Sequence, residues 1–315
     1  MVGHRAILRL MLREDAKPGH AEVRPFRPAA ALAALRPRQW TKNAVVLAPL
    51  FFSLRAREPG ASLRALLAVA VFSLVASAMY LVNDVADAEQ DRVHPLKRAR
   101  PIASGELSQG VAVAMAVALG VAGLASSLFL GPRFAAYVAA YVALQFGYSA
   151  VLKHVVVLDV FGVAGGFVLR VLAGAQAIPV PVSNWLYLCT LLLALFLALA
   201  KRRAEIVLLE GGAAQHRRIL SEYSLQLIDQ LVSITCACAV LAYSLYTLSQ
   251  ETIDRHGTDR LKYTIPLVIM GVFRYLYLVH QRSGGGEPES ALLGDRPLQV
   301  VLLAYAAVAG WALYL

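Results

Sequence analysis

The sequence predicts an all-α, polytopic membrane protein in which nine transmembrane helices surround a cytoplasm-facing cavity. Its 315 residues are 58% hydrophobic, with a mean hydropathy of +0.60, and this composition lies well outside that of a soluble domain. Several apolar runs approach the roughly 20 residues that a helix needs to cross the hydrocarbon core of a bilayer. The basic residues also alternate between loops, as they do in multi-pass membrane proteins.

Nine apolar runs define the predicted spans. The first is the shortest, the second leads into an acidic stretch, the fifth and eighth each contain an arginine, and the sixth ends in a basic run. Together they form one transmembrane domain, residues 36–315, preceded by a basic N-terminal tail, residues 1–35. The predicted spans are residues 43–57, 62–83, 109–130, 133–151, 155–177, 184–200, 227–249, 261–280 and 298–315.

The distribution of positive charge predicts the orientation of these spans. Of the 30 lysines and arginines, 21 lie in the N-terminal region or in the loops after even-numbered spans. Seven lie in the opposite loops or at the span ends beside them, and two, Arg170 and Arg274, lie deep within spans. Such an excess marks the cytoplasmic side. We therefore expect a multi-pass plasma-membrane protein with a cytoplasmic N-terminus and an external C-terminus. The same distribution explains the net charge of +10 without a nucleic-acid partner.

The N-terminal tail is basic but does not resemble a signal peptide, because its apolar stretch is short and is interrupted by Arg9. Arg5, Arg9 and Arg13 recur every four residues, opposite a small apolar set. This spacing is compatible with an amphipathic helix lying on anionic lipid. A disordered basic tail is the alternative interpretation.

An acidic stretch with the sequence NDVADAEQD, residues 83–91, follows the second apolar run. If it stays helical, Asp84, Asp87 and Asp91 project from one face, because positions i, i+3 and i+7 share a face. Their mutual repulsion would be relieved by a divalent cation, and Mg²⁺ usually takes one or two carboxylates plus waters and substrate phosphates. The stretch therefore predicts a magnesium site, with a solvated acidic loop as the alternative.

Other polar residues occur at even-numbered loops, on the same predicted side as the acids. Acids and bases gathered on one face are what a metal-bound, multiply phosphorylated substrate requires. Asp159 joins the three acids as a candidate catalytic residue. The candidate substrate-binding residues near this face are Asn83, Lys97, Arg100, Tyr148, Lys153, Lys201, Arg202 and Glu205, together with Lys42 before the first span.

Some of these residues also have simpler interpretations. The run Lys201-Arg202-Arg203 is typical of the cytoplasmic end of a helix, although the adjacent Glu205 suggests that at least one cation is held in a fixed geometry. Lys42 follows a tryptophan and could anchor the chain at the membrane interface. Either role is compatible with the sequence.

Arg170 lies inside the fifth span, three helical turns from Asp159. An intramembrane arginine costs about 2.5–3.5 kcal/mol on insertion scales and usually faces a cavity or a partner. We expect it to bind a substrate phosphate, with a structural ion pair as the alternative. Arg274 in the eighth span raises the same question.

The motifs resemble those of the UbiA superfamily of intramembrane prenyltransferases over residues 36–315. This resemblance implies nine transmembrane helices around a cavity, with two acidic motifs that hold a Mg²⁺-diphosphate. The second family motif is typically DxxxD, but here Val163 stands at the position of its second acid. The motifs that carry the resemblance are Asn83-Asp84-x-x-Asp87-x-x-x-Asp91, Lys97-Arg98-x-Arg100-Pro101-x-x-Ser104-Gly105 and Tyr148-x-x-x-Leu152-Lys153 leading to Asp159.

Further motifs are similar to one branch, the decaprenyl-phosphate phosphoribosyltransferases of mycobacterial arabinan synthesis. The branch implies transfer of 5-phosphoribosyl from phosphoribosyl pyrophosphate to decaprenyl phosphate with release of pyrophosphate. Three kinds of phosphate would then meet at the site, which suits the additional cations because Arg and Lys are the usual phosphate partners. The motifs are Arg36-Pro-x-Gln39-Trp40-x-Lys42-Asn43, Gly166-Phe167-x-Leu169-Arg170, Lys201-Arg202-Arg203-x-Glu205, Phe273-Arg274-Tyr275 and Asp295-Arg296-Pro297.

The resemblance also implies roles for individual residues. Asp84, Asp87 and Asp91 would hold Mg²⁺ and the pyrophosphate, Asn83 would orient the acids or contact a phosphate, and Tyr148 and Asp159 would hold the ribose or a second cation.

Two other functions stay open. One is transfer of a prenyl group to an aromatic or quinoid acceptor. The other is transport, which is disfavoured because the acids cluster at one membrane face and no inverted repeats occur.

Overall fold

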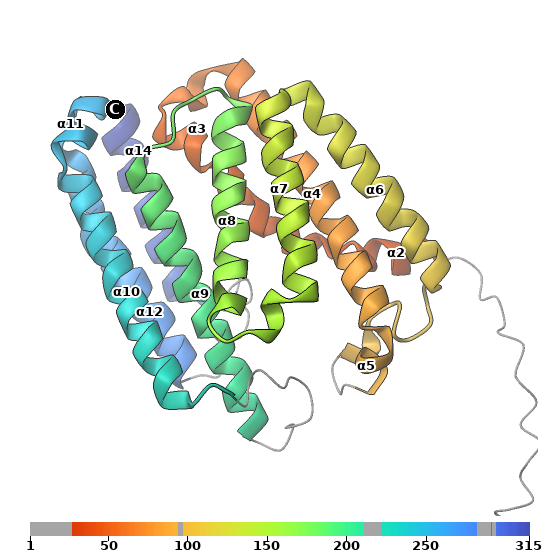
Figure 1. Cartoon of the computed structure of the whole chain (residues 1–315). Coiled ribbons are helices and arrows are strands. Elements are labelled where there is room, and N and C mark those ends of the chain that lie inside the picture. Colours follow the sequence, from red (N-terminus) through yellow and green to blue (C-terminus); the bar gives the residue numbers. More distant parts are fainter. Residues whose placement is uncertain (1–26, 94–96, 211–221, 282–290, 292–293) are drawn as a thin grey trace, which may run out of the picture.

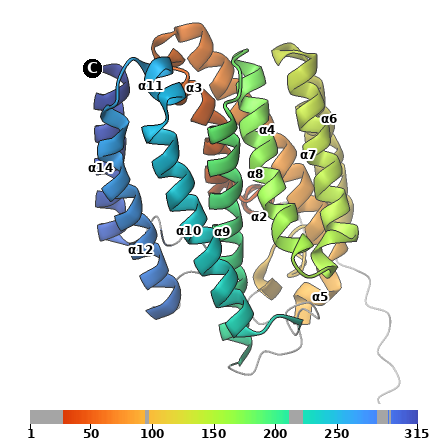
Figure 2. The same ribbon diagram turned by 60° about the vertical axis from the view of Figure 1, so that its left-hand side comes forward.

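The computed structural model describes residues 27–93, 97–210, 222–281, 291 and 294–315. These residues form a bundle of roughly parallel and antiparallel helices with no strands among them, as Figures 1 and 2 show. Eight of the helices are long and apolar enough to cross a membrane. The predicted all-α, polytopic membrane class is confirmed. The long helices are α4 (Pro59–Ala86), α6 (Gln109–Leu130), α7 (Pro132–Ala150), α8 (Leu158–Ala177), α9 (Asn184–Glu210), α10 (Leu225–Leu248), α12 (Ile265–Gln281) and α14 (Arg296–Tyr314).

The shorter elements connect these helices or extend them. The tail predicted for residues 1–35 lies outside the described residues as far as residue 26, and α2 falls within its last part. Between α4 and α6 the chain forms α5 and η3, and α11 and η6 follow α10. The short elements are α2 (Pro28–Ala34), η1 (Pro37–Leu47), α3 (Ala48–Phe52), η2 (Arg55–Arg57), α5 (Ala88–Val93), η3 (Lys97–Ala99), η4 (Leu152–His154), α11 (Gln250–His256) and η6 (Arg260–Thr264).

The first predicted span, residues 43–57, is not a single α-helix. The 3₁₀ helix η1 runs into the five-residue α3, and Pro49 lies in the first turn of α3. A proline in the middle of an α-helix would remove a hydrogen bond and clash with the preceding turn, so the segment restarts there instead. Because a 3₁₀ helix rises about 2 Å per residue, η1 and α3 together can still cover much of the bilayer depth.

α4 and α8 are the central helices of the bundle. About 56% of the apolar window of α4 and 61% of that of α8 are buried, compared with 11–28% for the other six spans. The outer helices expose large apolar side chains such as Phe129 and Leu303, as expected where lipid replaces water. The two central helices carry Asp84, Asp159 and Arg170, so the fold places these charged residues where the protein itself surrounds them.

One end of the bundle gathers the elements that carry the predicted site. α5, the end of α7, the start of α8 and the end of α9 all lie at the same end, at the bottom of Figure 1, whereas α11 and the C-terminus lie at the other. Charged residues that are far apart in sequence can therefore meet at one face of the membrane.

The segment η1 packs directly on α8 through Gly174. A Cβ atom at this position would lie 2.1 Å from the carbonyl oxygen of Val46, and backbone atoms cannot move aside as a flexible side chain can. We expect Gly174→Ala to destabilise the protein by at least about 1–3 kcal/mol, the usual cost of overpacking, and to lower the midpoint of thermal unfolding in detergent.

Gly120→Ala on α6 is the matched control, because its Cβ would meet Ala78 at 3.8 Å, an ordinary contact. Alanine favours the helix more than glycine does, so this control should unfold at or above the wild-type temperature. Equal stability of the Gly174 and Gly120 variants would contradict the packing of η1 on α8.

Candidate active site

The acidic stretch forms a bend rather than one continuous helix. α4 ends at Ala86, Asp87 caps it, and α5 begins at Ala88. Hydrogen bonds from the Asp87 amide to the Asn83 carbonyl (2.9 Å) and from the Asp91 amide to the Asp87 carbonyl (2.8 Å) carry the chain through the bend. Asp84 and Asp91 are buried, while the Asp87 side chain stays 37% exposed. The three acids therefore share one end of the bundle but divide into a buried pair and a more accessible third.

Arg100 links the two buried carboxylates. Its Nη1 atom donates to Asp91 Oδ2 at 2.5 Å and to Asp84 Oδ1 at 3.1 Å, so these two oxygens lie close to a single positive charge. The same Asp84 oxygen also accepts from Arg36 Nη2 at 2.5 Å. Charge-assisted hydrogen bonds of this kind are stronger than neutral ones. Both buried acids thus contact guanidinium groups.

Two lysines complete the positive surroundings of the acids. Lys153 Nζ on η4 lies 3.6 Å from Asp87 Oδ1, and Lys97 Nζ on η3 lies 4.0 Å from Asp91 Oδ1. Together with Arg36 and Arg100, four bases contact three acids. This excess of positive charge suits a ligand that brings several negative charges of its own.

The residues at this end fit a divalent cation that is shared with a ligand. No group of three or more His, Cys, Asp or Glu side chains gathers tightly enough among the described residues to form a complete metal cage. Mg²⁺ does not require one, because it is usually held by one or two carboxylates together with water and substrate phosphates. Asp84 and Asp91 would supply two hard oxygen ligands, and Asp87 lies beside them in the chain.

A second polar cluster surrounds Asp159 at the start of α8. Arg202 on α9 donates from Nε to Asp159 Oδ2 at 2.6 Å, and the Tyr223 hydroxyl donates to Asp159 Oδ1 at 2.7 Å. Arg202 also donates to Glu205 Oε2 at 2.5 Å and to the Tyr148 hydroxyl at 3.1 Å. Asp159 is fully buried, so both of its oxygens are used within the protein. These contacts favour a role in fixing α8 against α9, and contact with ribose or a second cation stays a prediction.

Adjacent residues of α7 connect the two clusters. Tyr148 accepts from Arg202, and the Ser149 hydroxyl donates to Asn83 Oδ1 at 2.6 Å. The Asn83 side chain is thereby held by α7, and its role in orienting the acids or contacting a phosphate stays a prediction. The contact between Lys153 and Asp87 forms a further link.

Arg170 is buried deeper in the bundle, and its hydrogen-bond partners are neutral groups. Its guanidinium donates to Asn43 Oδ1 (2.8 Å), to the Gly166 carbonyl (3.0 Å) and to the Tyr141 hydroxyl (2.9 Å), and it stacks on the Tyr141 ring at 4.5 Å. Burial of an arginine is tolerated when such partners are supplied. These contacts favour a structural role that joins η1, α7 and α8, and phosphate binding by Arg170 stays a prediction.

The remaining candidates lie near this end or stabilise helix packing. Lys42 on η1 and Lys201 on α9 are each half-buried and interact with other residues of the chain. Arg274 forms a two-point ion pair with Asp295, at 3.0 and 2.8 Å, and Asp295 also caps α14. For Arg274 the structural interpretation therefore explains the contacts.

Sequence reasoning did not include Arg36, Ser149 and Tyr223 among the site residues. Arg36 lies within a recognisable motif and adopts a left-handed backbone conformation, with φ of 55°, just before Pro37. That conformation allows the chain to turn into η1 while the side chain reaches Asp84. Tyr223 has no comparable sequence signal, because its contact with Asp159 spans 64 positions.

The fold and the site define a polytopic membrane protein with buried acids and an excess of bases at one end. The chain belongs to the UbiA prenyltransferase family, whose model matches residues 44–292. It is 36% identical over 289 residues to a decaprenyl-phosphate phosphoribosyltransferase of Mycobacterium tuberculosis, covering 90% of this chain and 94% of the relative. A relative of the same name from Corynebacterium glutamicum is 37% identical over 290 residues, covering 90% and 86% of the two chains.

A solved structure shares the fold. A UbiA homologue from Archaeoglobus fulgidus, bound to GPP and Mg²⁺, superposes with a TM-score of 0.67 at 19% sequence identity, covering 90% of this chain and 96% of its own. The predicted family and its fold are therefore confirmed.

Arg170→Lys tests whether Arg170 is structural. A single ammonium group cannot span three acceptors as a guanidinium does, and the loss of buried hydrogen bonds to a charged group costs about 1–3 kcal/mol each. We expect a lower thermal unfolding midpoint. The KM for phosphoribosyl pyrophosphate, the donor that the resemblance implies, should stay within about twofold of the wild type. A clear rise in KM with unchanged stability would instead place Arg170 in contact with phosphate.

Arg64→Lys provides the control for this experiment. Arg64 donates to the carbonyl groups of Ala177 and Leu130, at 2.6 and 2.7 Å, and both carbonyls lie at the helix ends opposite the acids. Its replacement should lower stability by a similar mechanism without altering KM.

Proposed function

We propose that this protein transfers the 5-phosphoribosyl group of phosphoribosyl pyrophosphate to decaprenyl phosphate and releases pyrophosphate. The observation that carries the proposal is the surplus of bases around the acids. A prenyl diphosphate brings one diphosphate group, whereas this reaction brings a diphosphate, a 5-phosphate and a lipid phosphate. Arg36, Lys97, Arg100 and Lys153 lie where several phosphates can be neutralised.

The curated relatives support the same reaction. The two decaprenyl-phosphate phosphoribosyltransferases match this chain over 94% and 86% of their own lengths. The motifs by which the sequence resembles this branch include residues of both polar clusters. The product of this reaction would serve as a precursor of cell-wall arabinan. Because the basic loops predict the orientation, we place the site at the cytoplasmic face of the plasma membrane, where a soluble phosphoribosyl donor is available.

The same charge asymmetry supports the rest of the topology. It favours a cytoplasmic N-terminus and an external C-terminus. The catalytic domain would comprise residues 36–315, after a basic tail of residues 1–35. The polyprenyl chain would extend sideways from the site into lipid, past the apolar outer faces of the bundle.

Asp84, Asp87 and Asp91 would hold Mg²⁺, which when bound neutralises charge on the leaving pyrophosphate. Arg36 and Arg100 would then turn from the carboxylates to the pyrophosphate oxygens, so that each guanidinium exchanges one anionic partner for another. Lys153, next to the accessible Asp87, is placed to meet a further phosphate. The acids, through the metal, and the bases would thus together stabilise the negative charge that develops on the leaving pyrophosphate.

The chemical step needs no protein nucleophile. An oxygen of decaprenyl phosphate forms the new bond to C1 of the ribose while the bond from C1 to the pyrophosphate oxygen breaks on the opposite face. The attacking oxygen is already anionic, so no strong general base is required. Catalysis would depend on positioning and charge stabilisation.

A lipid-extraction assay tests this function directly. Purified protein is incubated with Mg²⁺, decaprenyl phosphate and phosphoribosyl pyrophosphate labelled in the ribose. We expect label in the organic phase and one pyrophosphate released per lipid product. Label that stays in water, together with transfer from a labelled prenyl diphosphate to an aromatic acceptor, would replace the proposal with prenyl transfer.

The acids can be tested with charge-removing variants. We expect Asp84→Asn and Asp87→Asn to lower metal-dependent pyrophosphate release at least about a hundredfold, the usual effect of removing a group that stabilises transition-state charge. Asp254→Asn on α11 is the matched control and should retain wild-type activity, because Asp254 is exposed at the opposite end of the bundle. Full activity in either site variant would remove the metal assignment.

A further inference from the structure

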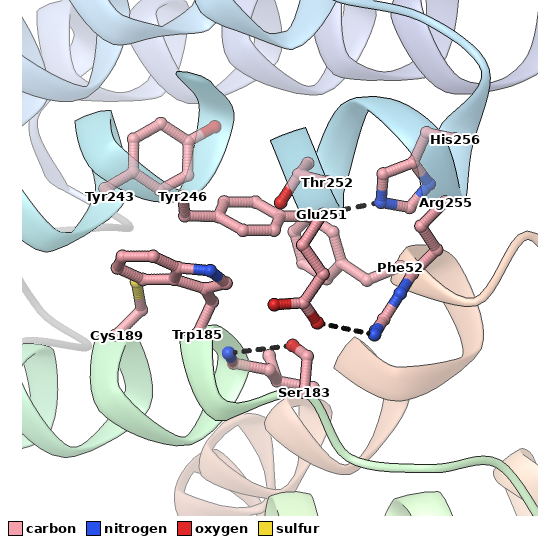
Figure 3. Close-up of a pocket in the computed structure, with 11 residues that line it drawn as sticks. Phe52, Ser183, Trp185, Cys189, Tyr243, Tyr246, Glu251, Thr252, Arg255 and His256 are labelled. Carbon is pink, nitrogen blue, oxygen red and sulfur yellow. Dashed lines mark hydrogen bonds and ion pairs between the residues drawn. The ribbon is translucent and has the colours of Figure 1, made fainter. Parts of the chain in front are cut away.

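The opposite end of the bundle contains a hollow lined by aromatic and charged side chains. Two adjoining cavities, of about 70 and 290 Å³, lie between α3, the start of α9, the end of α10 and α11. Figure 3 shows the residues that line the smaller one. They share wall residues, so they form one continuous hollow with a narrow inner part and a wider outer part. The shared residues are Phe52, Ser183, Leu186, Arg255 and His256.

Aromatic rings form the inner wall of this hollow. Phe52 and Tyr246 meet edge to face at 6.2 Å, and Trp185 and Tyr243 line the same cavity. Tyr246 is only 9% exposed. The aromatic residues of an ordinary membrane belt sit among lipid headgroups, whereas these rings surround an internal space.

Opposite charges meet beside the rings. Glu251 and Arg255, one turn apart on α11, form an ion pair of 2.8 Å, and both side chains are partly exposed, at 53% and 41%. Figure 3 shows the Glu251 carboxylate between Ser183 and the Arg255 guanidinium. The hollow therefore offers one anionic and one cationic group side by side, with little net charge.

His256 adds a polar atom that lacks a protein partner. Its Nε2 atom lies 3.3 Å from the Tyr246 hydroxyl, while its Nδ1 atom is buried and has no hydrogen-bond partner among the described residues. Burial, and secondarily the nearby Arg255, lower the pKa of His256, so the imidazole is neutral at neutral pH. A buried polar atom without a partner is costly.

We propose that this hollow binds the headgroup of a zwitterionic phospholipid. Its ammonium group would lie at Glu251 and the aromatic rings, and its phosphate at Arg255. Aromatic faces attract ammonium groups, and arginine is a preferred partner of phosphate. The acyl chains would leave the outer cavity into the surrounding bilayer.

The proposal can be tested with delipidated full-length protein in a neutral maltoside detergent. Binding of phosphatidylethanolamine, phosphatidylglycerol and soluble phosphoethanolamine is followed by native mass spectrometry and by the thermal unfolding midpoint, which a ligand specific to the folded state raises. We expect phosphatidylethanolamine to bind at least tenfold more tightly than the other two. Phosphatidylglycerol lacks the ammonium group, and phosphoethanolamine lacks the acyl chains.

Variants locate the site. Glu251→Gln should weaken phosphatidylethanolamine binding at least tenfold with little effect on phosphatidylglycerol, and Arg255→Gln should weaken binding of both lipids. Asp259→Asn is the matched control, because Asp259 forms an exposed ion pair with Lys262 near the same end and lines neither cavity. Phosphoribosyl transfer, measured in every variant, should stay unchanged and so reports that the fold is intact.

Three results would overturn the proposal. Equal binding of phosphatidylglycerol and phosphatidylethanolamine would indicate a simple anion site, and equal binding of phosphoethanolamine would indicate a site for a soluble phosphate ester. Wild-type binding by both Glu251→Gln and Arg255→Gln would place any bound lipid elsewhere. Because transfer activity is measured separately, failure of this proposal leaves the proposed enzymatic function untouched.

Discussion

The buried carboxylates of Asp84 and Asp91 impose the constraint on which this end of the molecule depends. A carboxylate removed from water must be paired with positive charge, because the cost of leaving it unpaired is several kcal/mol. Arg36 and Arg100 supply that charge in the structure. A substrate that arrives as a metal–diphosphate complex would replace both sets of partners. Its metal cation would pair with the acids, and its diphosphate would pair with the arginines.

The rest of the fold holds these groups in place. η1 packs on α8 at Gly174 and is tied to it by the hydrogen bond between Arg170 and Asn43. Trp40 on η1 donates to Ser77 on α4 at 3.0 Å, within one helical turn of Tyr80, over whose ring Arg36 lies at 5.2 Å. Contacts deep in the bundle thus determine where the Arg36 guanidinium lies. Arg170 supports this arrangement through its hydrogen bond to Asn43 on η1.

The sequence predicts the parts of this structure that follow from composition and spacing. Long apolar runs specify eight helices, and the acidic stretch and the basic loops specify one charged end. Proline chemistry explains why residues 43–57 do not form one helix, yet the length of η1 follows from tertiary packing. The contacts of Asp159 with Arg202 and Tyr223 join residues 43 and 64 positions apart, and no local pattern records such pairings. Likewise, the side-chain partners of Arg170, Asn43 and Tyr141, lie on other elements, so the sequence alone does not reveal them.

Electron paramagnetic resonance of Mn²⁺ can show whether Asp84 and Asp91 exchange Arg36 and Arg100 for a metal ion when substrate binds. In the wild-type protein without substrate, Arg36 and Arg100 compete with the metal for Asp84 and Asp91. The signal of free Mn²⁺ should therefore fall only slightly when protein is added, and strongly when phosphoribosyl pyrophosphate is added as well, beyond its fall with the substrate alone. Equal Mn²⁺ binding with and without substrate, or no binding in either case, would show that the acids do not exchange the arginines for a metal ion when substrate binds.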